Sequence, residues 1–187
     1  MCGNPTYAPE FEEEEGVEEY AEYVAAARKS HQLRYSLSAL RKDFPDHEFS
    51  KDCSITNIGR EGGEADNRAG VKVNIPAGAI SCPTVLSIRE CCGPFDLPEG
   101  IFLASPMFLI GSSQPVFNQN AYLSMEHFID FKQGDDVQLV LLTSPRKAPL
   151  RRFTHAGRVN MRDRKSQIGH VTLKHFSFTC FGILRCE

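Results

Sequence analysis

The residues best suited to chemistry lie near the end of the chain, in the tripeptide His175-Phe176-Ser177. A serine hydroxyl becomes a nucleophile when a histidine removes its proton, and it can then attack a peptide carbonyl. Attack on the preceding carbonyl would form an ester, and its hydrolysis by water would cut the chain between Phe176 and Ser177. The base could be His175 itself, or His155 or His170 brought near by the fold. We favour His155 over His170.

Alternation of apolar and polar residues predicts that this tripeptide lies on a strand, which we expect to include His170 as well. On such a strand His175 and Ser177 would share one face, while Phe176 and Phe178 would point into the core. A trans amide resists attack unless the fold strains it or directs donors at the oxyanion, and no residue pattern here indicates either. We therefore predict that the Phe176–Ser177 bond is intact in most of the protein.

A second candidate is the basic stretch from Arg146 to Lys165, which holds eight Lys or Arg residues and one acid, Asp163. Such a stretch can bind phosphate, acidic lipid or an acidic protein segment. Its one aromatic residue is Phe153, so the stacking that supports nucleic-acid binding is not expected. The residues that we predict to bind are Arg151, Arg152, Arg162 and Arg164. The simpler alternative is a solvated face without a partner.

The N-terminal segment offers this basic stretch a partner within the same chain. Between Glu10 and Glu22 lie eight glutamates and no basic residue. Docking of this acidic segment on the basic stretch would be weak and sensitive to salt, since an exposed ion pair contributes about 0–1 kcal/mol. The alternative is that the glutamates repel one another and the segment is disordered.

Composition indicates one ordinary globular core, with 187 residues of which 41% are hydrophobic and 24% charged. No apolar run approaches the roughly 18 residues that span a bilayer, and the N-terminus lacks the pattern of a signal peptide. The seven cysteines show no metal-binding spacing, so we interpret them as reduced thiols of a cytoplasmic protein. We expect Cys91 and Cys92 to be buried and inert, and we expect no metal and no cofactor.

Residues 1–50 are predicted to form an acidic extension that is partly disordered and partly helical. Good helix formers begin at about Glu18, and one helix or two broken helices are expected from there to Lys42. The side chains of Leu33, Leu37 and Leu40 would form one stripe of this helix. The sequence Phe44-Pro45-Asp46 would end it.

Residues 51–187 read as an all-β domain of short strands separated by turns. The segment Val71–Ile75 alternates like a strand with one buried face, Pro76 ends it, and Ile80 returns to the core after a tight corner. A hairpin loop at 66–70 precedes it. Further strands are predicted at 85–89, 103–110, 122–127 and 138–142, and the interior is predicted to include Ile75, Phe108, Leu141 and Phe176.

The corner Ile75-Pro76-Ala77-Gly78-Ala79-Ile80 resembles the Ile-Pro-Pro-Gly-Ala-Ile corner of the ZU5 domain, which zonula occludens proteins, Unc-five-type netrin receptors and ankyrins share. Ala77 is the one departure. The resemblance begins near Ser54 and includes the Ser-Pro pair at Ser105, although Met125-Glu126 alters a later corner. It implies an antiparallel β-sandwich that acts inside the cell as a protein-interaction, scaffold or autoinhibitory domain in receptor, cytoskeletal or death-domain signalling.

The resemblance also bears on the His-Phe-Ser tripeptide. In several ZU5-containing proteins of the death-domain and inflammasome type it is a site of self-cleavage, whereas ankyrin-type domains carry it without known cleavage. It places the chain nearest to this His-Phe-Ser-containing branch. Three hypotheses follow: an interaction domain, which we favour; a self-processing switch cut at Phe176–Ser177; and a binder of acidic lipid or acidic protein through the stretch from Arg146 to Lys165. Each is non-enzymatic beyond a single turnover. A protein partner is expected, nucleic acid is not, and membrane contact would come only from a longer parent protein or weak acidic-lipid binding.

Overall fold

The computed structural model describes residues 12–114, 117–132, 135–150, 152–163 and 165–185. The helices of this part are α1 (Glu12–Tyr35) and α2 (Leu37–Asp43). The strands are β1 (Glu48–Phe49), β2 (Ser54–Ile58), β3 (Gly63–Asp66), β4 (Val71–Ile75), β5 (Thr84–Cys92), β6 (Ile101–Leu103), β7 (Met107–Ser112), β8 (Ala121–Glu126), β9 (Val137–Ser144), β10 (Thr154–Arg158), β11 (Asn160–Met161), β12 (Ile168–Leu173) and β13 (Phe178–Arg185). None of the described helices is long and apolar enough to cross a membrane.

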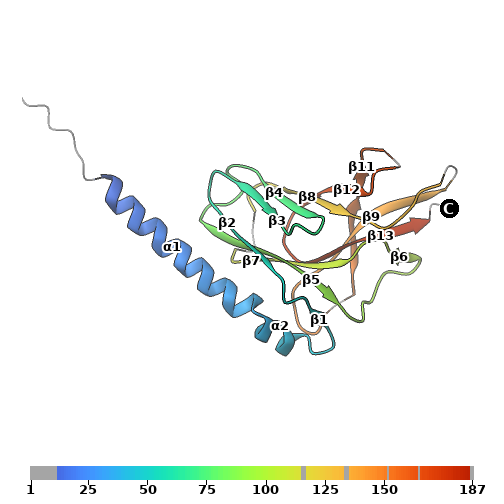
Figure 1. The fold of residues 1–187 in the computed structure, drawn as a ribbon, viewed down its shortest axis with the longest axis horizontal. Coiled ribbons are helices and arrows are strands. Elements are labelled where there is room, and N and C mark those ends of the chain that lie inside the picture. Colours follow the sequence, from blue (N-terminus) through green and yellow to red (C-terminus); the bar gives the residue numbers. More distant parts are fainter. Residues whose placement is uncertain (1–11, 115–116, 133–134, 151, 164, 186–187) are drawn as a thin grey trace, which may run out of the picture.

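The strands form two antiparallel sheets that face each other (Figure 1). The eight-stranded sheet has the order β1-β5-β7-β13-β9-β10, with β2 pairing with β5 and β6 with β13. The five-stranded sheet has the order β11-β12-β8-β4-β3. The predicted all-β sandwich with a helical N-terminal extension is therefore confirmed.

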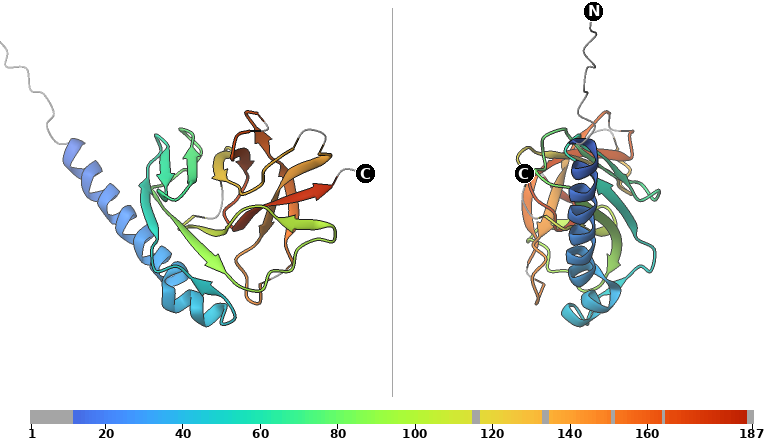
Figure 2. Two further views of the ribbon diagram at one scale, coloured as in Figure 1. Left: turned by 45° about the vertical axis from the view of Figure 1, so that its right-hand side comes forward. Right: turned by 90° about the vertical axis from the view of Figure 1, so that its left-hand side faces the viewer.

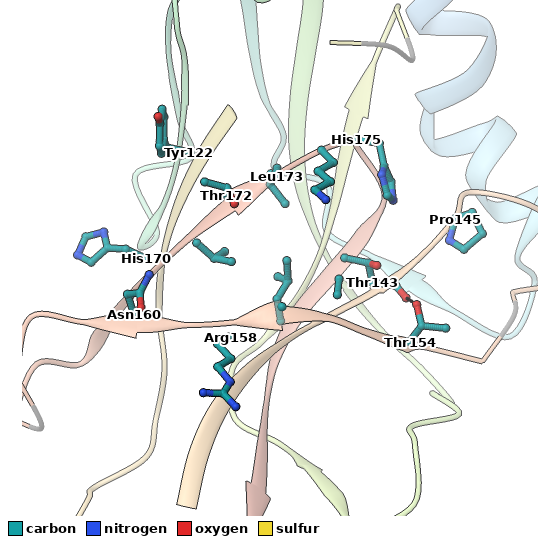
Figure 3. A pocket seen from close by; sticks show the side chains of 15 residues that line it. Tyr122, Thr143, Pro145, Thr154, Arg158, Asn160, His170, Thr172, Leu173 and His175 are labelled. Carbon is teal, nitrogen blue, oxygen red and sulfur yellow. Dashed lines mark hydrogen bonds between the residues drawn. The ribbon is translucent and has the colours of Figure 1, made fainter. Parts of the chain in front are cut away.

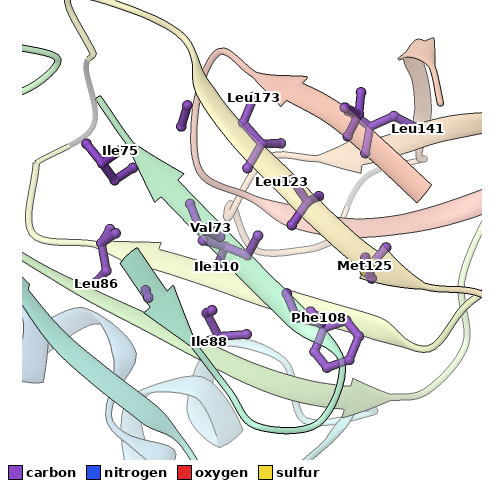
Figure 4. Packing of buried hydrophobic residues seen from close by; sticks show 14 of the residues in the cluster. Val73, Ile75, Leu86, Ile88, Phe108, Ile110, Leu123, Met125, Leu141 and Leu173 are labelled. Atoms are coloured by element: carbon purple, nitrogen blue, oxygen red, sulfur yellow. The ribbon is translucent and has the colours of Figure 1, made fainter. Parts of the chain in front are cut away.

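The core between the sheets is built by strands that alternate. In β4, Val71, Val73 and Ile75 are buried and the two residues between them are exposed, as predicted. Figure 4 shows the aliphatic side chains of both sheets meeting in this layer. Phe108 and Leu141 are buried there too, as predicted. Phe176 is only half-buried, with its ring edge-on to Phe117 at 4.1 Å between centroids, because it lies in a connection rather than on a strand.

A second core covers the outer face of the larger sheet. Strand β9 sends Val140 and Leu142 to this face, so both of its faces are buried, which explains its continuous apolar run. Helix α2 lies over this face, where Leu40 is 1% exposed. Phe44, which follows α2, extends this layer over the sheet and packs edge-on against Phe178, with 5.2 Å between the ring centroids. The segment that we assigned to the extension therefore supplies part of the core, and the domain boundary near residue 50 stays a prediction.

Helix α1 begins at Glu12, six residues before the expected start, so the described part of the acidic segment is helical rather than disordered. Ser36 interrupts the helix and caps α2, accepting a hydrogen bond from the backbone N–H of Ala39 at 3.3 Å. This break also disrupts the predicted leucine stripe: Leu40 is buried, whereas Leu33 is 72% exposed. Helix α2 ends at Asp43 with Phe44 as its C-cap, which confirms the predicted stop.

The buried end of α1 is tied to the larger sheet by polar contacts. His31 is 4% exposed, and its Nε2 hydrogen-bonds to Ser87 Oγ on β5 at 2.7 Å. Its ring stacks on Tyr35 at 4.9 Å. The N-terminal half of α1 runs beyond the sheets, and Val17 near that end is 68% exposed (Figures 1 and 2). These hydrogen-bond and ring contacts therefore anchor the second half of the helix.

Two loops position the strands around the sandwich. At 66–70 the predicted hairpin joins β3 to β4, and Asn67 Oδ1 accepts hydrogen bonds from the N–H groups of Ala69 and Val71 at 3.0 and 2.9 Å. The predicted strand at 103–110 is instead broken into β6 and β7. Pro106 cannot donate to a ladder, and Ser105 Oγ accepts from the N–H of Phe181 on β13 at 2.8 Å, which holds the break.

Candidate functional site

A groove of about 610 Å³ opens between β10 of the larger sheet and β12 of the smaller sheet. Figure 3 shows its two walls, with His170 and Thr172 on β12 and Thr154 and Arg158 on β10. Leu141 of β9, together with the inward side chains of β12, contributes an apolar floor. At this point the chain leaves the larger sheet after β10 and joins the smaller one as β11, so the groove lies where one continuous segment serves both sheets.

Both walls of this groove are strand edges, and on the groove side neither edge is fully paired with another strand among the described residues. Strand β10 pairs only with β9, at the end of the larger sheet. Strand β12 pairs with β8 along its whole length, but with β11 only at Gly169 and His170. The edge from Val171 to Leu173 is therefore open on the groove side. Unpaired strand edges offer backbone donors and acceptors to an added strand.

A bulge shapes the β10 wall. The register with β9 shifts between His155 and Gly157, so Ala156 has no opposite residue. A Cβ placed on Gly157 would meet no heavy atom within 4 Å, which shows that the groove is open at this point. Sequence reasoning did not identify Gly157 as part of a site; a glycine within a strand is the signal that could have pointed to a bulge.

The charged groups of the groove are cationic. Arg158 and Lys174 line it, together with the imidazoles of His170 and His175. Of the described residues that line the groove, none is Asp or Glu. Of these four residues, the sequence analysis named only the two histidines, as possible bases for Ser177. The groove itself could not be predicted, because it forms where two strands distant in the sequence meet.

The tripeptide His175-Phe176-Ser177 does not lie on a strand, contrary to prediction. Strand β12 ends at Leu173 and β13 begins at Phe178, and these strands belong to different sheets. The tripeptide is thus the crossover between the layers. His175 is exposed, whereas Ser177 is 1% exposed, so the two side chains do not share a face. The alternation that we extended through this segment ends where the chain changes sheets.

The hydroxyl of Ser177 is engaged within its own segment. Its Oγ donates to the carbonyl of Phe178 at 3.2 Å. The carbonyl of Ser177 accepts from the N–H of Ile110 at 3.0 Å and from Thr179 Oγ1 at 3.2 Å. Among the described residues no imidazole hydrogen-bonds to Ser177. The buried serine therefore lacks an adjacent base in this arrangement.

The three histidines considered as bases are all exposed. His155, which we favoured, lies on β10, and its Nε2 contacts the carbonyl of Gly157 at 3.1 Å. His170 lies on β12 rather than on a common strand with His175, and both face the groove. The structure thus brings two of the histidines to the groove and leaves Ser177 in the interior. The assignment of His175, Phe176, Ser177 and His155 to self-cleavage stays a prediction.

The basic stretch from Arg146 to Lys165 is spread over the molecule rather than gathered into a patch. Arg152 precedes β10 and pairs with Asp96 at 3.3 Å, with both side chains exposed. Arg162 follows β11, so two strands separate it from Arg152. Arg151 and Arg164 lie outside the described residues. Their predicted role in binding stays untested.

Arg146 has a structural place that sequence reasoning missed. Its Nη2 lies 2.7 Å from Asp43 Oδ2 and also donates to the carbonyl of Arg34 at the end of α1. The guanidinium lies over the rings of Tyr35 and Phe44, at 5.3 and 5.8 Å from their centroids. The basic stretch therefore contacts the N-terminal extension through Arg146, which lies at the C-terminus of α1, where a cation is favoured. None of the ion pairs between described residues joins a glutamate of α1 to this stretch.

The described cysteines are free thiols. Burial raises the pKa of Cys180 to about 12, and burial, with neighbouring acidic groups, raises the pKa of Cys91 further. Cys91 is buried as predicted, but Cys92 is exposed, because adjacent residues of β5 point to opposite faces. No three His, Cys, Asp or Glu side chains within the described ranges are placed to hold a metal ion.

Comparison with known proteins finds a family match for part of the sandwich. Residues 54–145 match the model of the ZU5 domain, from the start of β2 to just beyond the end of β9. The search of curated proteins finds no match to this chain. The match agrees with the predicted resemblance, while the nearer relation to the ankyrin and death-domain branch stays a prediction. ZU5 domains are generally protein-interaction domains. Residues 54–145 of the chain therefore match the ZU5 domain family.

Proposed function

We propose that this protein is an interaction domain that binds a partner protein through the groove between β10 and β12. The observation that carries the proposal is the presence of two unpaired strand edges, Thr154–Arg158 and 171–173, on one groove with an apolar floor. Exposed edges of this kind are usually short, charged or covered in proteins that do not use them. A groove with both edges open matches the geometry in which an extended peptide adds to a sheet.

The setting that we propose is a scaffold or autoinhibitory role in cytoplasmic signalling. The family supports an interaction role, and the free thiols of the described cysteines suit a reducing compartment. The rigid sandwich would hold the groove, while the N-terminal half of α1 extends beyond the sheets. Binding of acidic lipid through the stretch from Arg146 to Lys165 has less support, because Arg152 and Arg162 lie at separate ends of β10 and β11.

Self-processing is also less favoured by the geometry. Attack by Ser177 requires that its hydroxyl leave the carbonyl of Phe178 and meet a base, yet the three candidate histidines are exposed and two of them line the groove. The carbonyl of Ser177 accepts from the N–H of Ile110 and from Thr179 Oγ1, which holds the chain on the C-terminal side of the bond in place. We therefore propose that the Phe176–Ser177 bond stays intact and that the domain works without covalent chemistry.

A selection from a phage-displayed library of random peptides tests the proposed function. The full chain serves as bait, and Gly157→Leu serves as the counter-bait. At Gly157 an added Cβ meets no neighbour and the φ angle is negative or extended, so leucine fills the groove wall without disturbing the fold. We expect enriched peptides that bind the wild type and lose binding to Gly157→Leu. Their binding should shift the backbone amide signals of 156–158 and 171–173 in NMR spectra.

The result that contradicts the proposal is equally direct. Peptides that bind both baits alike, or that shift signals only on α1 and α2, would place the interaction elsewhere. A matched control is Gly16→Leu on α1, where an added Cβ also meets no heavy atom within 4 Å. This variant should retain every groove-dependent peptide.

A further inference from the structure

The geometry points to the kind of partner: we propose that the groove binds an extended peptide in which acidic and apolar residues alternate, added as a strand to the open edge of β12. The proposal rests on the proposed function and adds the chemistry of the ligand. Strand β11 already pairs with this edge at Gly169 and His170 and then departs. The peptide would continue the ladder from Val171 to Leu173, where β11 leaves it open.

The alternation follows from the two faces of β12. His170 and Thr172 point outward and are exposed, whereas Val171 and Leu173 point between the sheets. Residues of an added strand opposite Val171 and Leu173 would share their inward face. There they would meet Leu141 on the groove floor, so apolar side chains are required at these positions.

The outward positions call for acidic residues. A side chain opposite Thr172 would lie diagonal to both His170 and Lys174, because residues two apart on a strand flank the same cross-strand neighbour. Both of these line the groove, as does Arg158 on the opposite wall. With no acidic residue among the described lining, a carboxylate there meets donors and cations without a competing anion.

The shape of the groove supports one strand rather than a helix. An α-helix with side chains has a diameter of about 10–12 Å and satisfies its own backbone groups, whereas an extended chain can use the open edge of β12. Tyr122 lies directly opposite Thr172 on β8, so its ring borders the outward face where the acidic side chain would sit. The site thus combines backbone pairing, an apolar floor and a cationic rim.

Fluorescence anisotropy with a synthetic peptide tests this inference. The probe is a nine-residue, end-blocked, fluorescein-labelled peptide in which glutamate alternates with valine. Its counterpart has lysine in place of each glutamate. We expect the glutamate peptide to bind the full chain at low salt, with binding that weakens as salt is raised. The lysine peptide should bind at least about tenfold more weakly, since like charges face each other across the edge.

Variants of the groove sharpen the test. Lys174→Glu should weaken the glutamate peptide about tenfold and strengthen the lysine peptide, an exchange of preference that simple unfolding cannot produce. Lys51→Glu makes the same charge change on an exposed residue outside the groove lining and should change binding less than about twofold. Methylation of the backbone nitrogens that face β12 should abolish binding, because it removes their N–H donors. Methylation of the alternate set, which points away from β12, should spare binding, as strand addition requires.

Several outcomes would overturn the inference. Equal binding of the two peptides, or no exchange of preference in Lys174→Glu, would remove the acidic assignment. Anionic phosphatidylserine vesicles that bind in a Lys174-dependent way while the peptide does not would identify a lipid surface instead. Groove-dependent peptides from the random library that lack alternating acids would overturn this inference and leave the proposed function standing. The absence of any groove-dependent peptide would refute both.

Discussion

His31 is expected to make the anchoring of α1 dependent on pH. Burial, with a smaller effect from the nearby Arg89 guanidinium, lowers the pKa of His31 from 6.5 to about 4. The unfolded chain therefore binds a proton between pH 6.5 and 4 that the folded protein excludes. The stability due to neutral His31 is present at pH 7, declines as the pH falls through 6.5, and is lost by about pH 4.

The magnitude follows from the shift in pKa. Each pKa unit corresponds to about 1.4 kcal/mol, so the full shift at His31 corresponds to a loss of about 3 kcal/mol in the free energy of unfolding at low pH. Between pH 7 and pH 5 the linkage relation gives a loss of about 2 kcal/mol. In the folded protein the proton would place a cation in a buried position near Arg89.

Urea denaturation followed by circular dichroism measures this loss, with wild type and His31→Gln compared from pH 7 to pH 5. Glutamine keeps a hydrogen-bonding group and helix propensity but does not titrate. We expect wild type to lose about 2 kcal/mol relative to the variant over this range. Burial also lowers the pKa of His127, but both proteins contain His127, so its contribution cancels in the comparison.

The control is His170→Gln, which removes an exposed histidine and should follow the pH dependence of wild type. Parallel stability curves for wild type and His31→Gln would refute the reasoning, because they would mean that His31 titrates alike in the folded and unfolded chains. Hydrogen exchange then separates local from global effects. Loss of protection confined to α1 would show undocking of the helix with the sandwich intact.

Two further predictions concern Arg146 and the crossover. Arg146→Ala should lower the free energy of unfolding by about 2 kcal/mol in urea denaturation, because it removes a charged hydrogen-bond pair and two ring contacts, and Arg146→Lys should restore only part. Arg152→Ala, which breaks an exposed ion pair with Asp96, should change the free energy of unfolding by less than about 0.5 kcal/mol. Equal losses for Arg146→Ala and Arg152→Ala would contradict the structural role of Arg146. Denaturing mass spectrometry should find the chain uncut, and a fragment of residues 177–187 that vanishes in Ser177→Ala would show self-cleavage.

Local patterns in the sequence predicted the sandwich because each reflects the immediate surroundings of a strand. The alternation at Val71–Ile75 and the proline that ends it depend on one buried face and one missing donor, and both appear in the structure. The strand predicted at 138–142 likewise appears in the structure, as β9. Such features need no knowledge of which strands become neighbours.

The predictions that failed depended on such knowledge. Leu33 has the spacing of a helix stripe, but Ser36 restarts the helix in a new direction and leaves Leu33 in solvent. The alternation from β12 was extended through His175 to Ser177, where the chain in fact crosses between sheets. No local signal marks that crossing, because Val171 and Phe178 are equally apolar although they face different layers.

The groove and the anchored helices are joined by one short connection after β9. Pro145 lines the groove, and the next residue, Arg146, is held by Asp43 and by the end of α1. The groove wall at this end is therefore supported from the opposite side of the larger sheet by the helices. A strand-binding site needs edges held in place before the ligand arrives, since ordering them on binding costs affinity. The buried part of the N-terminal extension thus holds the larger sheet, whose edge strand β10 forms the groove wall opposite β12.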